Sequence, residues 1–249
     1  MNKRHWCMVC FMAVILTVVF MAPGLQAADV PKNEKVSQKE VLSAGVEIST
    51  EELKHILNEG KIPVIDVRPE KEYAISHIPG SVNIFETKIE EMIKATPDKS
   101  SGPALYCNGP YCHKTMRVAE KLSKKGYTNI KKYRHGLPVW RAFGNTAETS
   151  MSGFRYIHKL DKTAVFVDAR SKEEYKAGSI PGAVNLQANE IETANNDGRL
   201  PYTDHGTRII VFGNTIQQAR QLAETIAQRA YWNSSYLAAT YEDLKKAGL

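Results

Sequence analysis

An internal repeat constrains the fold of this 249-residue chain more than any other feature. Residues 66–84 begin with Asp-Val-Arg and end with Ile-Pro-Gly-Ser-Val-Asn-Ile, and residues 168–186 repeat that pattern at a constant offset of 102 residues. A period of this length matches one complete α/β domain and is too long for a solenoid unit. The repeat therefore predicts two similarly folded domains, at residues 46–145 and 153–249, separated by the polar stretch 145–152.

The order of apolar segments predicts an α/β fold within each repeat. Ser49 and Glu52 form a capping-box pattern that opens a helix, and residues 114–125 have a helical apolar face. Short apolar strands are expected between the helices, at residues 63–67, 104–107, 130–133 and 208–212. Strands that alternate with helices predict a largely parallel sheet covered on both faces.

The N-terminus has the pattern of a signal peptide. A basic start precedes an uncharged apolar run over residues 6–22, whose core is shorter than the ~20 residues of a membrane span. We expect residues 1–27 to be a signal peptide cleaved after Ala27, which predicts a periplasmic or otherwise exported protein. An uncleaved membrane anchor is the alternative, because the whole uncharged run would just span a thin bilayer. Residues 28–45 are polar and are expected to form a linker.

The charge distribution and the number of cysteines exclude some classes of function. The 33 Lys and Arg residues are interleaved with 27 Asp and Glu residues, so no basic stripe predicts a nucleic-acid partner. Four cysteines are too few for a disulfide-framework protein. Signal cleavage would remove Cys7 and Cys10 and leave only Cys107 and Cys112, which lie in one segment. Export normally leads to an oxidising compartment, so these two thiols are expected to act together.

Two segments resemble the rhodanese family of sulfurtransferases. They are VIDVRPEKEYAISHIPGSVNI at residues 64–84, most of which returns in the second repeat, and GLPVW at residues 136–140. The resemblance covers both repeats and implies two tandem rhodanese-like domains, each with a central, mostly parallel sheet flanked by helices. It further implies an active-site loop whose cysteine carries sulfur as a persulfide, without a cofactor or a metal.

The sequence around Cys107 also fits the role of the sulfur-carrying cysteine. It ends an apolar strand, and a short loop then leads directly into a helix, whose N–H groups and positive dipole end lower a thiol pKa and bind anions. We therefore predict Cys107 as the nucleophile. The loop residues expected to bind the anionic donor are Asn108, Gly109, Pro110, Tyr111, His113 and Lys114. The expected partners are a small sulfur donor such as thiosulfate or a persulfide, a thiol or cyanide-like acceptor, and a thiol-redox protein.

The loop departs from the family pattern Cys-x-x-Gly-x-Arg. The fifth position after Cys107 is Cys112 instead of Arg, and the loop is about two residues longer than is usual, judged from the apolar face of the following helix. The longer loop also makes the phosphatases and arsenate reductases of Cys-x5-Arg type an alternative class for this protein. Their anion-clamping Arg would stand at His113, so phosphoryl chemistry is disfavoured.

Three interpretations of Cys112 follow from its position. It is a resolving thiol that attacks a persulfide on Cys107 and releases sulfide, or it forms a structural disulfide with Cys107, or both cysteines bind a metal with His113. The reactive pair is favoured, because a bond across so short a loop removes little entropy from the unfolded chain. The alternative function is a non-catalytic or thiol-redox binding module with a Cys107–Cys112 disulfide.

The second repeat keeps the scaffold and lacks the nucleophile. Gly213 stands where the first repeat has Cys107, and the following loop is about half as long, so this domain is expected to be catalytically silent. Charged residues shared by both repeats are therefore predicted to be structural, as ion pairs among Asp66, Arg68 and Glu72 and among Asp168, Arg170 and Glu174. His135 is a weak candidate for substrate contact, and His77 lies in a turn that the family uses structurally.

Overall fold

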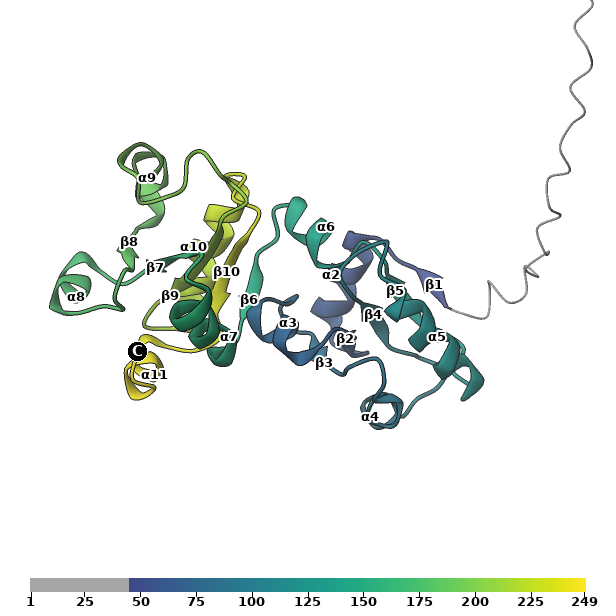
Figure 1. Ribbon diagram of the computed structural model, residues 1–249. Helices are drawn as coiled ribbons and strands as arrows, with labels where there is room; N and C mark the ends of the chain where they lie inside the picture. Colours follow the sequence, from purple (N-terminus) through teal and green to yellow (C-terminus); the bar gives the residue numbers. More distant parts are fainter. Residues whose placement is uncertain (1–44) are drawn as a thin grey trace, which may run out of the picture. The chain divides into compact units, whose positions relative to one another are not determined.

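The computed structural model describes residues 45–249, which belong to one compact unit. The expected signal peptide and nearly all of the expected linker lie outside the described residues. Within residues 45–249 the chain forms two five-stranded sheets flanked by helices (Figure 1). None of the helices in this range is long and apolar enough to cross a membrane.

The first sheet has the strand order β1-β5-β4-β2-β3, and every neighbouring pair is parallel. Its strands are β1 (Val46–Glu47), β2 (Val64–Asp66), β3 (Val82–Asn83), β4 (Ala104–Tyr106) and β5 (Lys131–Tyr133). The helices are α2 (Thr50–Glu59), α3 (Glu70–Ile75), α4 (Ile89–Ala95), α5 (Lys114–Lys124) and α6 (Gly136–Ala142). The capping box of Ser49 and Glu52 is present and opens α2, as the sequence predicts.

The central strands of this sheet are buried on both faces. Val64 and Ala104 pack with Leu53 of α2 in one apolar cluster, whereas Ile65 and Leu105 pack with a second cluster that includes α5. Successive residues of a strand point to opposite faces, so a short continuous apolar run supplies both cores. This burial holds the end of β4, and the loop that follows it, in a fixed position.

The second sheet has the order β6-β10-β9-β7-β8, again all parallel, which is the same arrangement as in the first. Its strands are β6 (Ala147–Thr149), β7 (Ala164–Asp168), β8 (Val184–Asn185), β9 (Arg208–Phe212) and β10 (Ser234–Leu237). The surrounding helical elements are α7 (Met151–Tyr156), η1 (Ile157–Asp161), α8 (Lys172–Ala177), η2 (Ala188–Glu190), α9 (Ile191–Asp197), α10 (Ile216–Gln228) and α11 (Tyr241–Lys246). The predicted fold class of two α/β units is therefore confirmed.

The polar stretch 145–152 contains a strand, which its composition did not predict. β6 pairs with β10, and its Glu148 also exchanges two backbone hydrogen bonds of 2.9 Å with His77 of the first repeat. Gly153 then packs so closely on Ala74 that a Cβ atom would collide with the Ala74 carbonyl. Tertiary hydrogen bonds, which local periodicity does not encode, thus order this stretch.

The Asp and Arg residues shared by both repeats form buried ion pairs, as predicted, whereas Glu174 accepts from Asn214 and makes no ion pair with Arg170 within the described residues. Arg68 lies 2.6 Å from Asp66, and Arg170 lies 2.7 Å from Asp168. Each Arg also donates to the backbone carbonyl of a residue that follows the next helix, Ser76 in the first repeat. Glu72 is a more distant partner, at 3.8 Å from Arg68. The pairs therefore fix the turn after β2 and β7 in both domains.

Candidate active site

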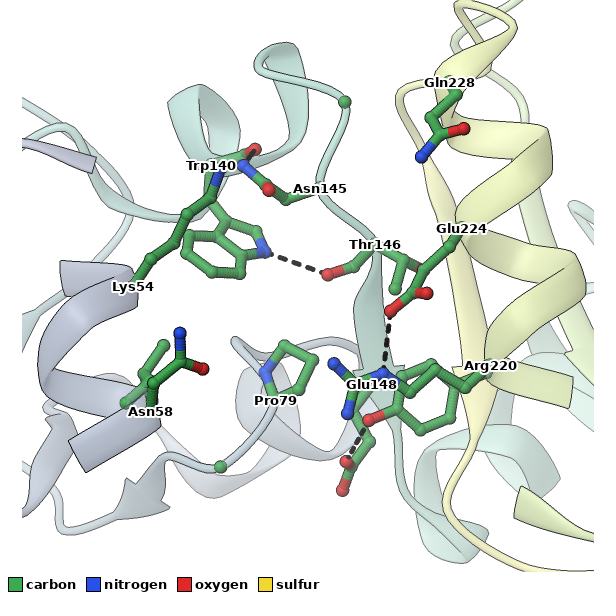
Figure 2. Close-up of a pocket in the computed structure, with 14 residues that line it drawn as sticks. Lys54, Asn58, Pro79, Trp140, Asn145, Thr146, Glu148, Arg220, Glu224 and Gln228 are labelled. Carbon is green, nitrogen blue, oxygen red and sulfur yellow. Dashed lines mark hydrogen bonds and ion pairs between the residues drawn. The ribbon is translucent and has the colours of Figure 1, made fainter. Parts of the chain in front are cut away.

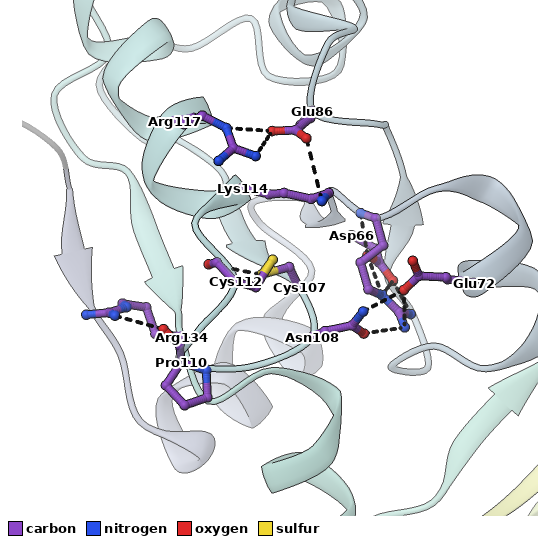
Figure 3. The surroundings of a disulfide bond; sticks show 11 residues. Asp66, Glu72, Glu86, Cys107, Asn108, Pro110, Cys112, Lys114, Arg117 and Arg134 are labelled. Carbon is purple, nitrogen blue, oxygen red and sulfur yellow. Dashed lines mark hydrogen bonds and ion pairs between the residues drawn. A yellow bond between two sulfur atoms is a disulfide. The ribbon is translucent and has the colours of Figure 1, made fainter.

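The two cysteines lie at the carboxyl end of β4 and are joined by a disulfide (Figure 3). Cys107 follows the strand directly and is 1% exposed, whereas Cys112 is half-buried just before α5. Their Cα atoms are 6.4 Å apart. Sγ of Cys107 also lies 3.4 Å from the carbonyl oxygen of Cys112, so the loop folds back over the buried sulfur.

Two glycines allow the loop to take this shape. The N–H of Cys112 donates to the carbonyl of Gly109 at 3.0 Å, and Gly109 has a φ of +120°, which disfavours other residues. Gly136, at the start of α6, has a φ of +64°, and a Cβ atom there would collide with the Cys107 carbonyl and the Gly109 nitrogen. The N–H of Leu137 donates to that same Cys107 carbonyl at 3.3 Å. The first turn of α6 therefore packs against the loop and stabilises its shape.

The loop carries backbone donors without acceptors. In the described part of the chain, the N–H groups of Asn108, Gly109, Tyr111 and His113 make no hydrogen bond. His113 is the N-cap of α5, and its side chain does not cap the helix. Free N–H groups at a helix start bind anions through their partial positive charge. The loop can therefore hold negative charge beside the sulfur of Cys107.

The predicted cationic side chains of the loop differ in their surroundings. Lys114 lies 3.7 Å from Glu86, which also accepts a 2.7 Å hydrogen bond from Arg117. The two cations therefore share this carboxylate. His113 is exposed. Arg134, which the sequence reasoning missed, donates to the Pro110 carbonyl at 3.0 Å. Nothing local to the loop could have identified Arg134, because it lies on the segment that follows β5.

Asn108 connects the loop to the buried ion pair. Its side-chain oxygen accepts a 3.0 Å hydrogen bond from Arg68, and its side-chain nitrogen donates to Glu72 at 2.6 Å. Arg68 is held in turn by Asp66, which lies at the end of β2. The first residue after the nucleophile is thus positioned by the motif that the two repeats share.

The remaining sequence candidates lie in different places. Tyr111 is 93% exposed at the tip of the loop, and Pro110 is exposed beside it. His135 is exposed and makes an edge contact with the ring of Tyr133. His77 is buried, stacks on Tyr73 and lies 3.2 Å from a carboxylate oxygen of Glu148, so it belongs to the contact with β6.

The counterpart loop of the second repeat lacks the sulfur, and a side chain accepts one of its N–H groups. Asn214 follows Gly213 and donates to Glu174 at 2.6 Å, as Asn108 does to Glu72. Gln218 accepts from the Asn214 N–H at 2.8 Å and donates to the Ala169 carbonyl at 3.0 Å, and Thr215 caps α10. Side chains of the chain itself therefore occupy the place that a bound anion would take.

A pocket of about 470 Å³ lies away from the cysteine loop and is lined by residues of α2, α6, β6 and α10 (Figure 2). Several of its polar groups bond one another: Arg220 bonds Glu224 at 2.8 Å, and Tyr236 donates to Glu148 at 2.7 Å. No residue of the loop 107–113 lines it. Over residues 45–249 there is also no group of three or more His, Cys, Asp or Glu side chains that could hold a metal ion.

The fold and this site define a tandem α/β protein with a cysteine loop in its first domain only. The rhodanese-like domain model matches residues 49–143 and 156–247. The chain therefore belongs to the rhodanese-like family, and it carries that domain twice.

Individual relatives match shorter stretches. The chain is 36% identical over 67 residues to the thiosulfate sulfurtransferase PspE of Escherichia coli, covering 26% of this chain and 62% of that protein. It is 32% identical over 116 residues to the adenylyltransferase and sulfurtransferase MOCS3 of Arabidopsis thaliana, covering 41% of this chain and 25% of that protein. A solved thiosulfate sulfurtransferase from Pseudomonas aeruginosa is 19% identical, with a TM-score of 0.39, over 82% of this chain and 45% of that chain. The matches thus span less than two thirds of each relative.

Proposed function

We propose that this protein is an exported sulfurtransferase that moves sulfane sulfur through a persulfide on Cys107. The observation that carries the proposal is the placement of Cys107 at the end of β4, in a loop whose N–H groups lack acceptors and that leads into α5. Membership of the rhodanese-like family and the partial match to two named sulfurtransferases support it. Export rests on the pattern of residues 1–27.

Loading of the cysteine begins with reduction of the disulfide, for which a dithiol partner supplies two electrons and two protons. The Cys107 thiolate then attacks the outer sulfur of a donor such as thiosulfate. An S–S bond forms at Sγ, the S–S bond of thiosulfate breaks, and sulfite leaves with the electron pair. The four loop N–H groups without an acceptor stabilise the negative charge of the persulfide.

Two routes discharge the persulfide. A thiophilic acceptor, such as cyanide or a thiol, attacks the outer sulfur and returns Cys107 to the thiolate. Alternatively, the Cys112 thiol attacks Sγ of Cys107, which forms the Cys107–Cys112 disulfide and releases the outer sulfur as sulfide. The second route would produce the disulfide that joins these two residues, and this bond supports a role of Cys112 as the resolving thiol.

The same disulfide favours a second candidate function. A protein whose two cysteines stay oxidised would serve as a thiol-redox or non-catalytic binding module. It would exchange electrons with a partner, or bind one, without transferring sulfur. The two candidates differ in whether the reduced protein accepts sulfur from a donor.

Steady-state turnover separates the candidates. With thiosulfate and cyanide, the reduced wild-type protein is expected to release sulfite, Cys107→Ser to release none, and Cys112→Ser to retain turnover. With no added thiol, Cys112→Ser is expected to stop the release of sulfide. If the reduced wild type released no sulfite from thiosulfate and gained no sulfur from an organic persulfide, the sulfurtransferase function would be wrong. Unchanged sulfide release in Cys112→Ser would remove its resolving role alone.

A further inference from the structure

A small cavity next to the cysteine loop gathers three arginines. It measures about 210 Å³, and Asn108 of the loop is part of its wall. The arginines come from three separate elements: Arg68 after β2, Arg141 in α6 and Arg208 at the start of β9. Three cations around one cavity repel one another unless negative charge lies between or beside them. The partners of each arginine therefore decide what the cavity can hold.

Two of the three arginines have a carboxylate partner. Arg68 is paired with Asp66 at 2.6 Å, and Arg208 is paired with Asp161 at 3.0 Å. Arg141 has no carboxylate within ion-pairing distance among residues 45–249. Its guanidinium donates to the hydroxyl of Ser76, and its Nε is buried without any acceptor in the same range. One positive charge of the cavity thus lacks a counter-ion.

The electrostatic setting agrees with this geometry. Burial, followed by the charges of Arg68 and Arg208, lowers the pKa of Arg141 to about 10. A buried cation without a partner destabilises a folded protein, since its lost hydration is not replaced. A bound anion would supply both the missing charge and the missing acceptor for Nε.

Two further polar groups of the cavity wall restrict which ligands the cavity can bind. Glu72 supplies a carboxylate, but it is engaged by Asn108 at 2.6 Å. Asn233 has a buried side-chain oxygen without a donor among the described residues, so the site also offers an acceptor to a protonated oxygen or a water molecule. The volume suits a small tetrahedral ion with a few waters, each of which takes roughly 30 Å³. A large organic anion would not fit inside.

We propose that this cavity binds a small oxyanion of sulfur or phosphorus, with Arg141 as its principal ligand. The site goes beyond sulfur transfer, because it would bind an anion whether or not Cys107 carries sulfur. Arg208 and Asn233 come from the second repeat, so the domain without a cysteine completes the site. Arg68 donates to Asn108, which couples the cavity to the first residue after the nucleophile.

Sulfate is the first probe, because it has the required shape and charge and donates no sulfur. Titration calorimetry of the wild-type protein, in a chloride background, is expected to show one saturable site. Arg141→Gln is expected to weaken sulfate binding at least about tenfold, the usual cost of losing a charged hydrogen bond. Arg229→Gln is the matched control, since it removes one positive charge from an exposed pair with Glu192. It is expected to bind sulfate as the wild type does.

The midpoint of thermal unfolding, Tm, provides a second readout of binding that does not depend on the heat of binding. Low millimolar sulfate is expected to raise Tm in the wild type and in Arg229→Gln, and not in Arg141→Gln. If Arg141→Gln does not fold, Arg208→Gln tests the same cavity from β9. Titrations with phosphate and thiosulfate distinguish the two sources of the ligand by which ion binds more tightly.

The absence of saturable binding of sulfate, thiosulfate and phosphate to the wild type would overturn the proposal. Equal sulfate affinity in Arg141→Gln and the wild type would overturn it as well. Either result would leave the persulfide on Cys107 untouched, because turnover with thiosulfate tests that function separately.

Discussion

The loops after β4 and β9 begin in the same way and end differently. Each starts with an Asn that donates to a Glu of the preceding repeat motif, Asn108 to Glu72 and Asn214 to Glu174. After β4 the chain leaves its N–H groups free around a buried cysteine, whereas after β9 the side chain of Gln218 accepts one of them. The sheet provides a position for a site in both domains. Only the loop after β4 combines unsatisfied donors with a sulfur, so only this loop can hold an anion beside a nucleophile.

The largest expected effect on stability tests what the two domains share. Asp66→Asn and Asp168→Asn each remove the charge that compensates a buried Arg, and each is expected to lower the free energy of unfolding by about 3 kcal/mol. Denaturant unfolding measures both. Asp168→Asn is expected to keep sulfur transfer, because its domain has no cysteine. A loss of stability in only one of the two variants would contradict a common structural role.

A smaller effect is expected from a pair of glycines in the first domain. Gly136→Ala combines a positive φ with a collision against the cysteine loop, and is expected to cost about 2 kcal/mol of unfolding free energy. Gly144→Ala is the matched control, because it has a φ of +73° and no atom within 4 Å of the added Cβ. Its expected cost is about 1 kcal/mol. Equal costs in the two variants would show that α6 does not support the loop closely.

The smallest effect concerns the contact of β6 with the first repeat, through its pH dependence. Burial raises the pKa of Glu148, but hydrogen bonds with His77 and Tyr236 outweigh burial, and the net pKa lies below the ordinary value of 4.5. A carboxyl whose folded pKa is lowered stabilises the fold above its unfolded pKa, and this stabilisation is lost as the pH falls through the folded value. Glu148→Gln is therefore expected to unfold with a weaker dependence on pH below 4.5. Acid titration followed by circular dichroism measures this slope, and an unchanged slope would contradict the assignment.

The sequence predicted most of the scaffold because its signals are local. Short apolar runs between helical patterns predicted β2, β4, β5 and β9, and the helix expected over residues 114–125 is observed as α5. The buried pairs of Asp66 with Arg68 and Asp168 with Arg170 follow from a motif that occurs twice. Such features depend on residues that are near one another along the chain.

The features that the sequence did not predict depend on distant residues. β6 is short and polar, and it becomes a strand because it pairs with β10, which follows it by more than eighty residues. Lys114 was expected to bind the anionic donor, and the sequence did not predict that it shares Glu86 with Arg117. The cavity around Arg141 joins residues from both repeats. No periodicity in the sequence encodes these contacts, so they could be found only from the folded chain.

Intact-mass measurement after one exposure of the reduced protein to thiosulfate tests the central claim most directly. Cys112→Ser, which lacks the resolving thiol, is expected to gain one sulfur atom, which peptide mapping would place on Cys107, whereas the wild type is expected to release that sulfur as sulfide and form the Cys107–Cys112 disulfide. Cys107→Ser is expected to gain none, and adding Gly213→Cys to that variant should not restore the gain, because the side chain of Gln218 fills the space beside Gly213. No gain of sulfur in Cys112→Ser, or an equal gain in Cys107→Ser, would contradict the account.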